Sequence, residues 1–77
     1  MSRRFQDSDF LVWEAYPSGS KFGYAERPHI IFNCLTNRRL RPRFVESEGD
    51  AADAERLVAT ARPADLLELL GSAREIA

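Results

Sequence analysis

A single histidine and a single cysteine are the side chains of this 77-residue sequence that first suggest catalysis. His29 could act as a base toward the thiol of Cys34 only if the two side chains came within hydrogen-bonding distance. They lie five residues apart in a run rich in β-branched and aromatic residues, which predicts one strand over 29–35. Successive side chains of a strand point to opposite faces, so an odd separation keeps these two apart. We therefore expect neither a Cys–His dyad nor a shared metal site, and we expect Cys34 to be a small buried thiol.

Two other groups of residues have types that bind ions. Asp7, Asp9 and Glu14 could offer oxygen ligands to a hard cation, but their spacing is not that of a calcium loop, and turn aspartates commonly accept hydrogen bonds from their own backbone. The segment 19–21 (GSK) lacks the first glycine of a phosphate-binding loop, and no helix is predicted after it. We expect no enzyme activity, no metal, no cofactor and no small-molecule substrate.

The strands and helices predicted to position these residues form one small α+β domain over residues 1–77. Its expected form is a four-stranded antiparallel meander with one or two C-terminal helices packed on one face. Asp50 is placed to cap the first helix, although the segment 46–62 could instead be a loose acidic linker. Pro42 favours an edge position for the last strand. The predicted strands cover about 4–7, 10–16, 29–35 and 39–45, and the predicted helices about 51–61 and 63–72.

The direction of the side chains on the fourth strand depends on the turn before it. Phe32 lies on the better core face of the third strand, and Phe44 joins that face only if the turn has an odd length. We therefore expect a three-residue turn at 36–38, with Asn37 or Arg38 in the left-handed region. A two-residue turn would place three arginines beside Phe32, which is unfavourable.

The same alternation predicts an open face on the side of the sheet away from the helices. If Trp13 faces the helices, then Phe10, Val12 and Tyr16 belong to the open face, together with the arginines of the fourth strand. Aromatic residues of the long 17–28 loop form a second exposed group. The candidate partner-binding residues are therefore Arg38, Arg39, Arg41, Arg43, Ile31, Phe22 and Tyr24.

Composition and charge narrow the class of protein. The formal net charge is −1, but residues 1–45 carry eight bases and four acids, whereas residues 46–77 carry three bases and eight acids. No apolar run is long enough for a signal peptide or a membrane span. One cysteine cannot form an intrachain disulfide, so we expect a reducing, cytoplasmic compartment. Ten of the eleven basic residues are arginine, which is typical of a GC-rich bacterial genome.

These observations favour a binding protein over an enzyme. A domain of this size is marginally stable, so covering more apolar surface with a partner would stabilise it. We expect a protein-interaction module or accessory subunit that binds a protein partner or itself through the open face and the 17–28 loop. The alternative is a single-stranded nucleic-acid-binding protein that uses the basic strand, from Arg38 to Arg43, together with aromatic loop residues.

Overall fold

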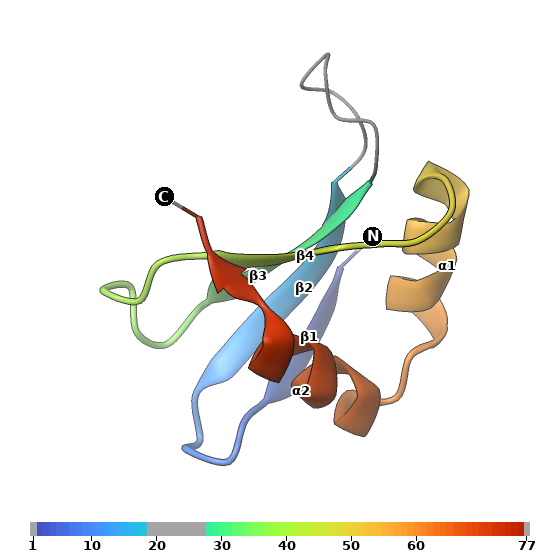
Figure 1. The fold of residues 1–77 in the computed structure, drawn as a ribbon. Helices are drawn as coiled ribbons and strands as arrows, with labels where there is room; N and C mark the ends of the chain where they lie inside the picture. The colour runs from blue at the N-terminus through green and yellow to red at the C-terminus, as the bar shows by residue number, and fades with distance from the viewer. Residues whose placement is uncertain (1, 19–27, 77) are drawn as a thin grey trace.

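The computed structural model describes residues 2–18 and 28–76 and forms an α+β domain, as predicted. The strands make one antiparallel sheet in the order β1-β2-β3-β4-β5 (Figure 1). Along the chain, two helices follow β4 and precede β5. The predicted meander of four strands thus has a fifth, two-residue strand at its edge. The elements are β1 (Arg3–Gln6), β2 (Val12–Ser18), β3 (His29–Cys34), β4 (Arg43–Glu46), α1 (Ala51–Thr60), α2 (Pro63–Ser72) and β5 (Arg74–Glu75).

The core lies between the helices and one face of the sheet. Alternate residues of β2 and β3 point into it, which is the period of two that a half-covered strand requires. Helix α1 packs on β2 and β3, whereas α2 reaches both β1 and β4. The rings of Phe5 and Phe32 meet edge to face, with centroids 6.0 Å apart. The buried core residues are Phe5, Trp13, Ala15, Ile30, Phe32, Cys34, Val58, Leu66 and Leu70.

Strand β2 continues further than predicted, through Pro17 to Ser18. Proline cannot donate a hydrogen bond, so it is tolerated in a strand only where no neighbour requires its N–H. The described pairing of β1 with β2 ends at Arg3 opposite Ala15, and Pro17 pairs only with Ile30 of β3. The proline therefore interrupts no ladder bond on the β1 side.

The predicted three-residue turn between β3 and β4 is wrong. Strand β3 ends at Cys34 and β4 begins at Arg43, so the connection has eight residues, and neither Asn37 nor Arg38 has a positive φ. Asn37 instead closes a turn in which its carbonyl accepts from the N–H of Leu40 at 3.2 Å and its Oδ1 from the N–H of Arg39 at 3.1 Å. Leu40 packs against the core from this connection, outside any strand.

Compared with the predicted turn, the longer connection shifts the pairing of β4 with β3 by one residue. The side chains of β4 that were predicted to face the helices therefore point away from them, and the others point toward them. Ile30 pairs with Val45, whereas a three-residue turn would have placed it opposite Phe44. A slip of one residue exchanges the two faces of a strand. Phe44 therefore lies opposite Ile31 on the face away from the helices, and Arg43 lies opposite Phe32 on the helix side.

Strand β4 is not the edge of the sheet. Pro42 stands just before it, and the short strand β5 pairs along its outer side, with Phe44 opposite Arg74. The carbonyl of Pro42 accepts a hydrogen bond from the N–H of Ile76 at 2.8 Å. A strand of two residues has no detectable periodicity, so its position depends on where α2 delivers the chain.

Both predicted helices are present, and the acidic segment before α1 is an ordered cap. Asp50 Oδ1 accepts from the N–H of Asp53, and Asp53 Oδ2 accepts from the N–H of Asp50, each at 3.0 Å. The hydrogen bond from the backbone N–H of Asp53 is the main reason that the pKa of the Asp50 carboxyl is lowered. Gly49 precedes the cap with φ +84°, a conformation that few other residues adopt. Pro63 occupies the first turn of α2, as its missing N–H favours.

Neither helix in the described part of the chain has the length and apolar character needed to cross a membrane.

Candidate protein-docking face of the sheet

The side chains that point away from the helices form a surface that we call the open face. Strand registers assign its members, because directly paired residues lie on the same side of a sheet. Its central residues are half-buried, and no described helix covers them. The open face consists of Arg4, Gln6, Val12, Glu14, Tyr16, Ser18, His29, Ile31, Asn33, Phe44, Glu46 and Arg74.

The centre of the open face is an apolar row that crosses three strands. Ile31 of β3 lies between Tyr16 of β2 and Phe44 of β4 in direct cross-strand pairs. The imidazole of His29 packs edge to face on the ring of Phe44, with centroids 5.5 Å apart. Asn33 Nδ2 donates to the hydroxyl of Tyr16 at 3.4 Å. These contacts hold the rings in place, so the row presents a preordered apolar surface.

Charged residues of both signs border this row. On the β1 side, Arg4 Nε lies 3.8 Å from Glu14 Oε2, and the hydroxyl of Ser2 donates to the same carboxylate at 3.0 Å. On the β5 side, the exposed Arg74 pairs with Phe44 across the strands. Ion pairs this exposed contribute little stability. Their effect is to border an apolar centre with charge, which is the usual anatomy of a protein interface.

The predicted arginine cluster is divided by the structure. Arg38, Arg39 and Arg41 are exposed, but they lie in the β3–β4 connection and not on a strand of the open face. Arg43 is on the helix side of β4, where its guanidinium carbon stands 5.5 Å from the centroid of the Trp13 ring. The expected cost of an arginine beside Phe32 is offset because Arg43 is only partly buried and its charge lies over the indole ring.

Arg43 is therefore expected to stabilise the fold, unlike its neighbour Arg41. Arg43→Gln removes a cation–π contact and should lower the free energy of unfolding by about 1 kcal/mol. The matched control Arg41→Gln changes an exposed side chain with the same charge and should have an effect below about 0.5 kcal/mol. Urea unfolding of both variants measures the difference. Equal losses in the two variants would show that the contact over Trp13 has no energetic role.

The apolar and aromatic residues predicted to be exposed for binding fall into three groups. Ile31 is on the open face, as predicted, whereas Phe22 and Tyr24 lie outside the described residues. Val12 and Tyr16 are on the open face, but Phe10 lies in the β1–β2 turn, 78% exposed and with φ +65°. The alternation of β4 alone could not identify Phe44, since either Phe44 or Val45 could have faced the core.

The residues considered for catalysis do not meet. His29 lies on the open face, and Cys34 is buried on the helix side, pairing with Trp13, so the predicted separation is confirmed. Asp7 accepts hydrogen bonds from the backbone of its own turn, as predicted for a turn aspartate. Within residues 2–18 and 28–76, no group of three or more histidine, cysteine or acidic side chains is arranged to hold a metal.

Comparison with known proteins returns no match to a protein-family model, a curated protein or a solved structure.

Proposed function

We propose that this protein is a non-enzymatic interaction module that binds a protein partner through the open face. The observation that carries the proposal is the row Tyr16, Ile31 and Phe44, which is apolar, preordered by its neighbours and covered by no helix among residues 2–18 and 28–76, while the opposite face holds both helices. Burying such a row against a partner removes apolar surface from water at about 25 cal/mol per Å².

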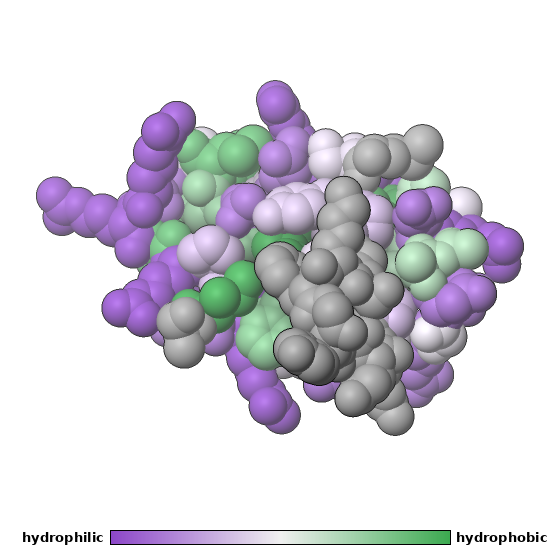
Figure 2. Space-filling view, turned by 90° about the horizontal axis from the view of Figure 1, so that it is seen from above, coloured by the Kyte–Doolittle hydropathy of each residue, from purple (hydrophilic) through white to green (hydrophobic). Residues whose placement is uncertain are grey.

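The composition of the open face favours a protein as the partner. Aromatic side chains and arginine are enriched at protein interfaces, and both are present here in Tyr16, Phe44, Arg4 and Arg74. This mixture on the open face fits reversible docking better than permanent burial, because obligate interfaces are more uniformly apolar. Hydrophobic and hydrophilic residues are also interspersed on the side of the molecule seen from above in Figure 2.

A reducing compartment fits this proposal. Cys34, the only cysteine in the sequence, is 8% exposed and lies against the core, where it behaves as a small apolar residue. We accordingly propose a cytoplasmic, bacterial accessory protein whose first partner to test is a second copy of the chain.

The experiment compares two variants of the open face with one of the helix surface. Ile31→Glu and Phe44→Glu each place a charge in the apolar row, whereas Ala52→Glu places the same charge on the exposed side of α1. Sedimentation across a concentration series measures self-association, and co-purification from the source cell measures binding of other proteins. Both open-face variants should weaken association at least about tenfold, or 1.4 kcal/mol, and Ala52→Glu should not.

Two outcomes would contradict the proposal. Open-face variants that keep their folded circular-dichroism spectrum and also keep their association would exclude the row as the contact surface. Binding to a single-stranded oligonucleotide that weakens steeply with salt, and that is lost in the Arg38, Arg39 and Arg41 glutamine variant, would instead establish nucleic-acid binding.

A further inference from the structure

A groove separates α1 from α2 on the helix-covered side of the sheet. It consists of two adjoining hollows, of about 410 and 290 Å³, that share Leu57 and Leu69 as lining residues. The larger hollow extends toward the α1–α2 connection at Ala61, and the smaller one extends down to Ile30 and Val45 of the sheet. We call this feature the helix groove. It lies on the opposite side of the sheet from the open face.

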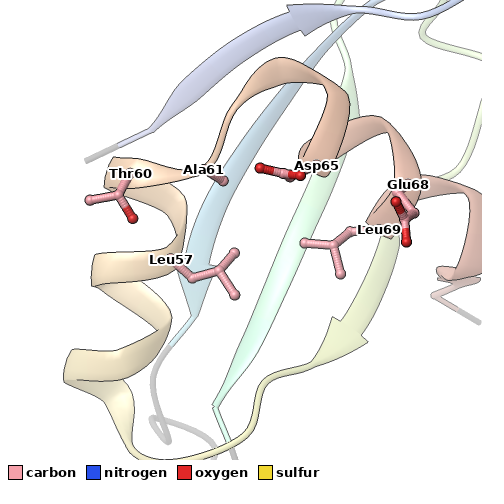
Figure 3. A pocket seen from close by; sticks show the side chains of 6 residues that line it. All are labelled: Leu57, Thr60, Ala61, Asp65, Glu68 and Leu69. Carbon is pink, nitrogen blue, oxygen red and sulfur yellow. The ribbon is translucent and has the colours of Figure 1, made fainter.

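The floor of the helix groove is apolar. Figure 3 shows the side chains of Leu57 and Leu69 projecting toward each other from the two helices, with Ala61 at the connection above them. Both leucines are half-buried and pack against the core. Apolar side chains left partly exposed in a concave site can be covered further by one large apolar side chain of a ligand.

The rim of the helix groove is acidic. Apart from Glu46, whose side chain belongs to the open face, the described lining residues include four carboxylates and no lysine or arginine. Two of the acids are engaged within their own helices, since Asp65 Oδ2 lies 3.3 Å from Arg62 Nε and Asp53 Oδ1 lies 3.8 Å from Arg56 Nη1. Glu48 and Glu68 are exposed and form no ion pair with any residue that the structure describes. The rim therefore has an excess of negative charge beside an apolar floor.

We propose that the helix groove binds a short basic segment of a partner protein, one that presents a large apolar side chain flanked by arginine or lysine. The apolar side chain would lie between Leu57 and Leu69, and the flanking cations would face Glu48 and Glu68. Charge complementarity around an apolar centre would provide orientation and rapid association, and burial would provide affinity. Because this site is independent of the open face, the chain would hold two proteins at once and act as an adaptor.

The test uses synthetic peptides and isothermal titration on the full chain. One peptide has two leucines flanked by arginines, and its two controls replace the arginines by glutamines or by glutamates. The arginine peptide should bind at least about tenfold more tightly than the glutamine peptide, and the glutamate peptide should not bind. Raising the ionic strength from about 0.01 to 0.15 M shortens the screening length from roughly 30 to 8 Å and should weaken the arginine peptide most.

Variants of the chain locate the peptide. Glu48→Gln with Glu68→Gln removes the unpaired rim charges from exposed positions and should weaken the arginine peptide about tenfold, whereas Glu55→Gln, on the other side of α1, should not. Leu57→Gln should weaken the arginine and glutamine peptides alike. An arginine peptide that binds the rim variant as tightly as the wild type would overturn the proposal. Self-association lost in the Leu57→Gln variant would also overturn it, in favour of a second copy in the groove.

Discussion

Asp7→Ala is expected to lower the free energy of unfolding by about 3 kcal/mol, a large fraction of the roughly 4 to 12 kcal/mol available to a domain of this length. The carboxylate joins the β1–β2 turn to the core. Its Oδ2 accepts from Trp13 Nε1 at 2.8 Å, and its Oδ1 accepts from the N–H groups of Asp9 and Leu11 at 2.8 and 3.0 Å. Trp13 is only 2% exposed, so alanine leaves its indole N–H without this acceptor.

Asp7→Asn removes the charge but only part of the hydrogen bonding. Asparagine keeps one acceptor oxygen for the turn, but its amide nitrogen cannot accept from Trp13, so we expect a loss of about half the alanine value. Urea unfolding at pH 7, monitored by tryptophan fluorescence, measures the free energy of unfolding of both variants. Losses below about 0.5 kcal/mol for both would contradict a structural role for this carboxylate.

The stabilisation by Asp7 should depend on pH in a defined direction. Burial raises the pKa of Asp7, but hydrogen bonds from Trp13, Leu11 and Asp9 and the charge of Arg43 outweigh it and hold the pKa below the ordinary value of 3.8. The ionised form is therefore favoured by folding. Its contribution is complete above pH 3.8 and is lost as the pH falls through the lower folded-state pKa. Wild type and Asp7→Asn should accordingly converge in stability at the acid end of the range.

Leu66→Ala is expected to lower the free energy of unfolding by about 3 kcal/mol as well, but through loss of core packing. Leu66 of α2 is fully buried in the core cluster between the helices and the sheet. Truncating it removes apolar contacts and leaves a cavity, for which losses of about 3 to 5 kcal/mol are typical. In a domain of this length such a loss lowers the melting temperature by more than about 10 °C.

The neighbouring leucine is a matched control for this variant. Leu67 has the same type in the same helix but is only half-buried, so Leu67→Ala should cost about 1 kcal/mol. Thermal melting of both variants under one set of conditions gives the comparison. Equal losses at the two positions would show that α2 does not present Leu66 to the core as its period indicates.

The class of fold, both helices and most of the sheet could be predicted from the sequence, because the signals are local. Period-two alternation placed His29 and Cys34 on opposite faces and grouped Trp13 with Ala15 on one face of their strand. Asp50 and Pro63 marked the helix starts through hydrogen bonds and backbone geometry within their own turns. Each of these features depends on residues a few positions apart, so no knowledge of the remaining chain was needed.

Only the tertiary structure decided which side chains of β4 face the helices, and only it revealed the strand β5 and the helix groove. Leu40 packs against the core from the arginine-rich β3–β4 connection and not from a strand. Strand β4 could therefore pair one residue away from the predicted register, which places Phe44 on the open face and Arg43 on the helix side. Alternation specifies which residues share a face but not which face meets the helices. That choice depends on how Val45 of β4 packs together with Leu57 and Leu69 of the two helices. Contacts between residues so far apart in the chain cannot be recognised from any single stretch of sequence.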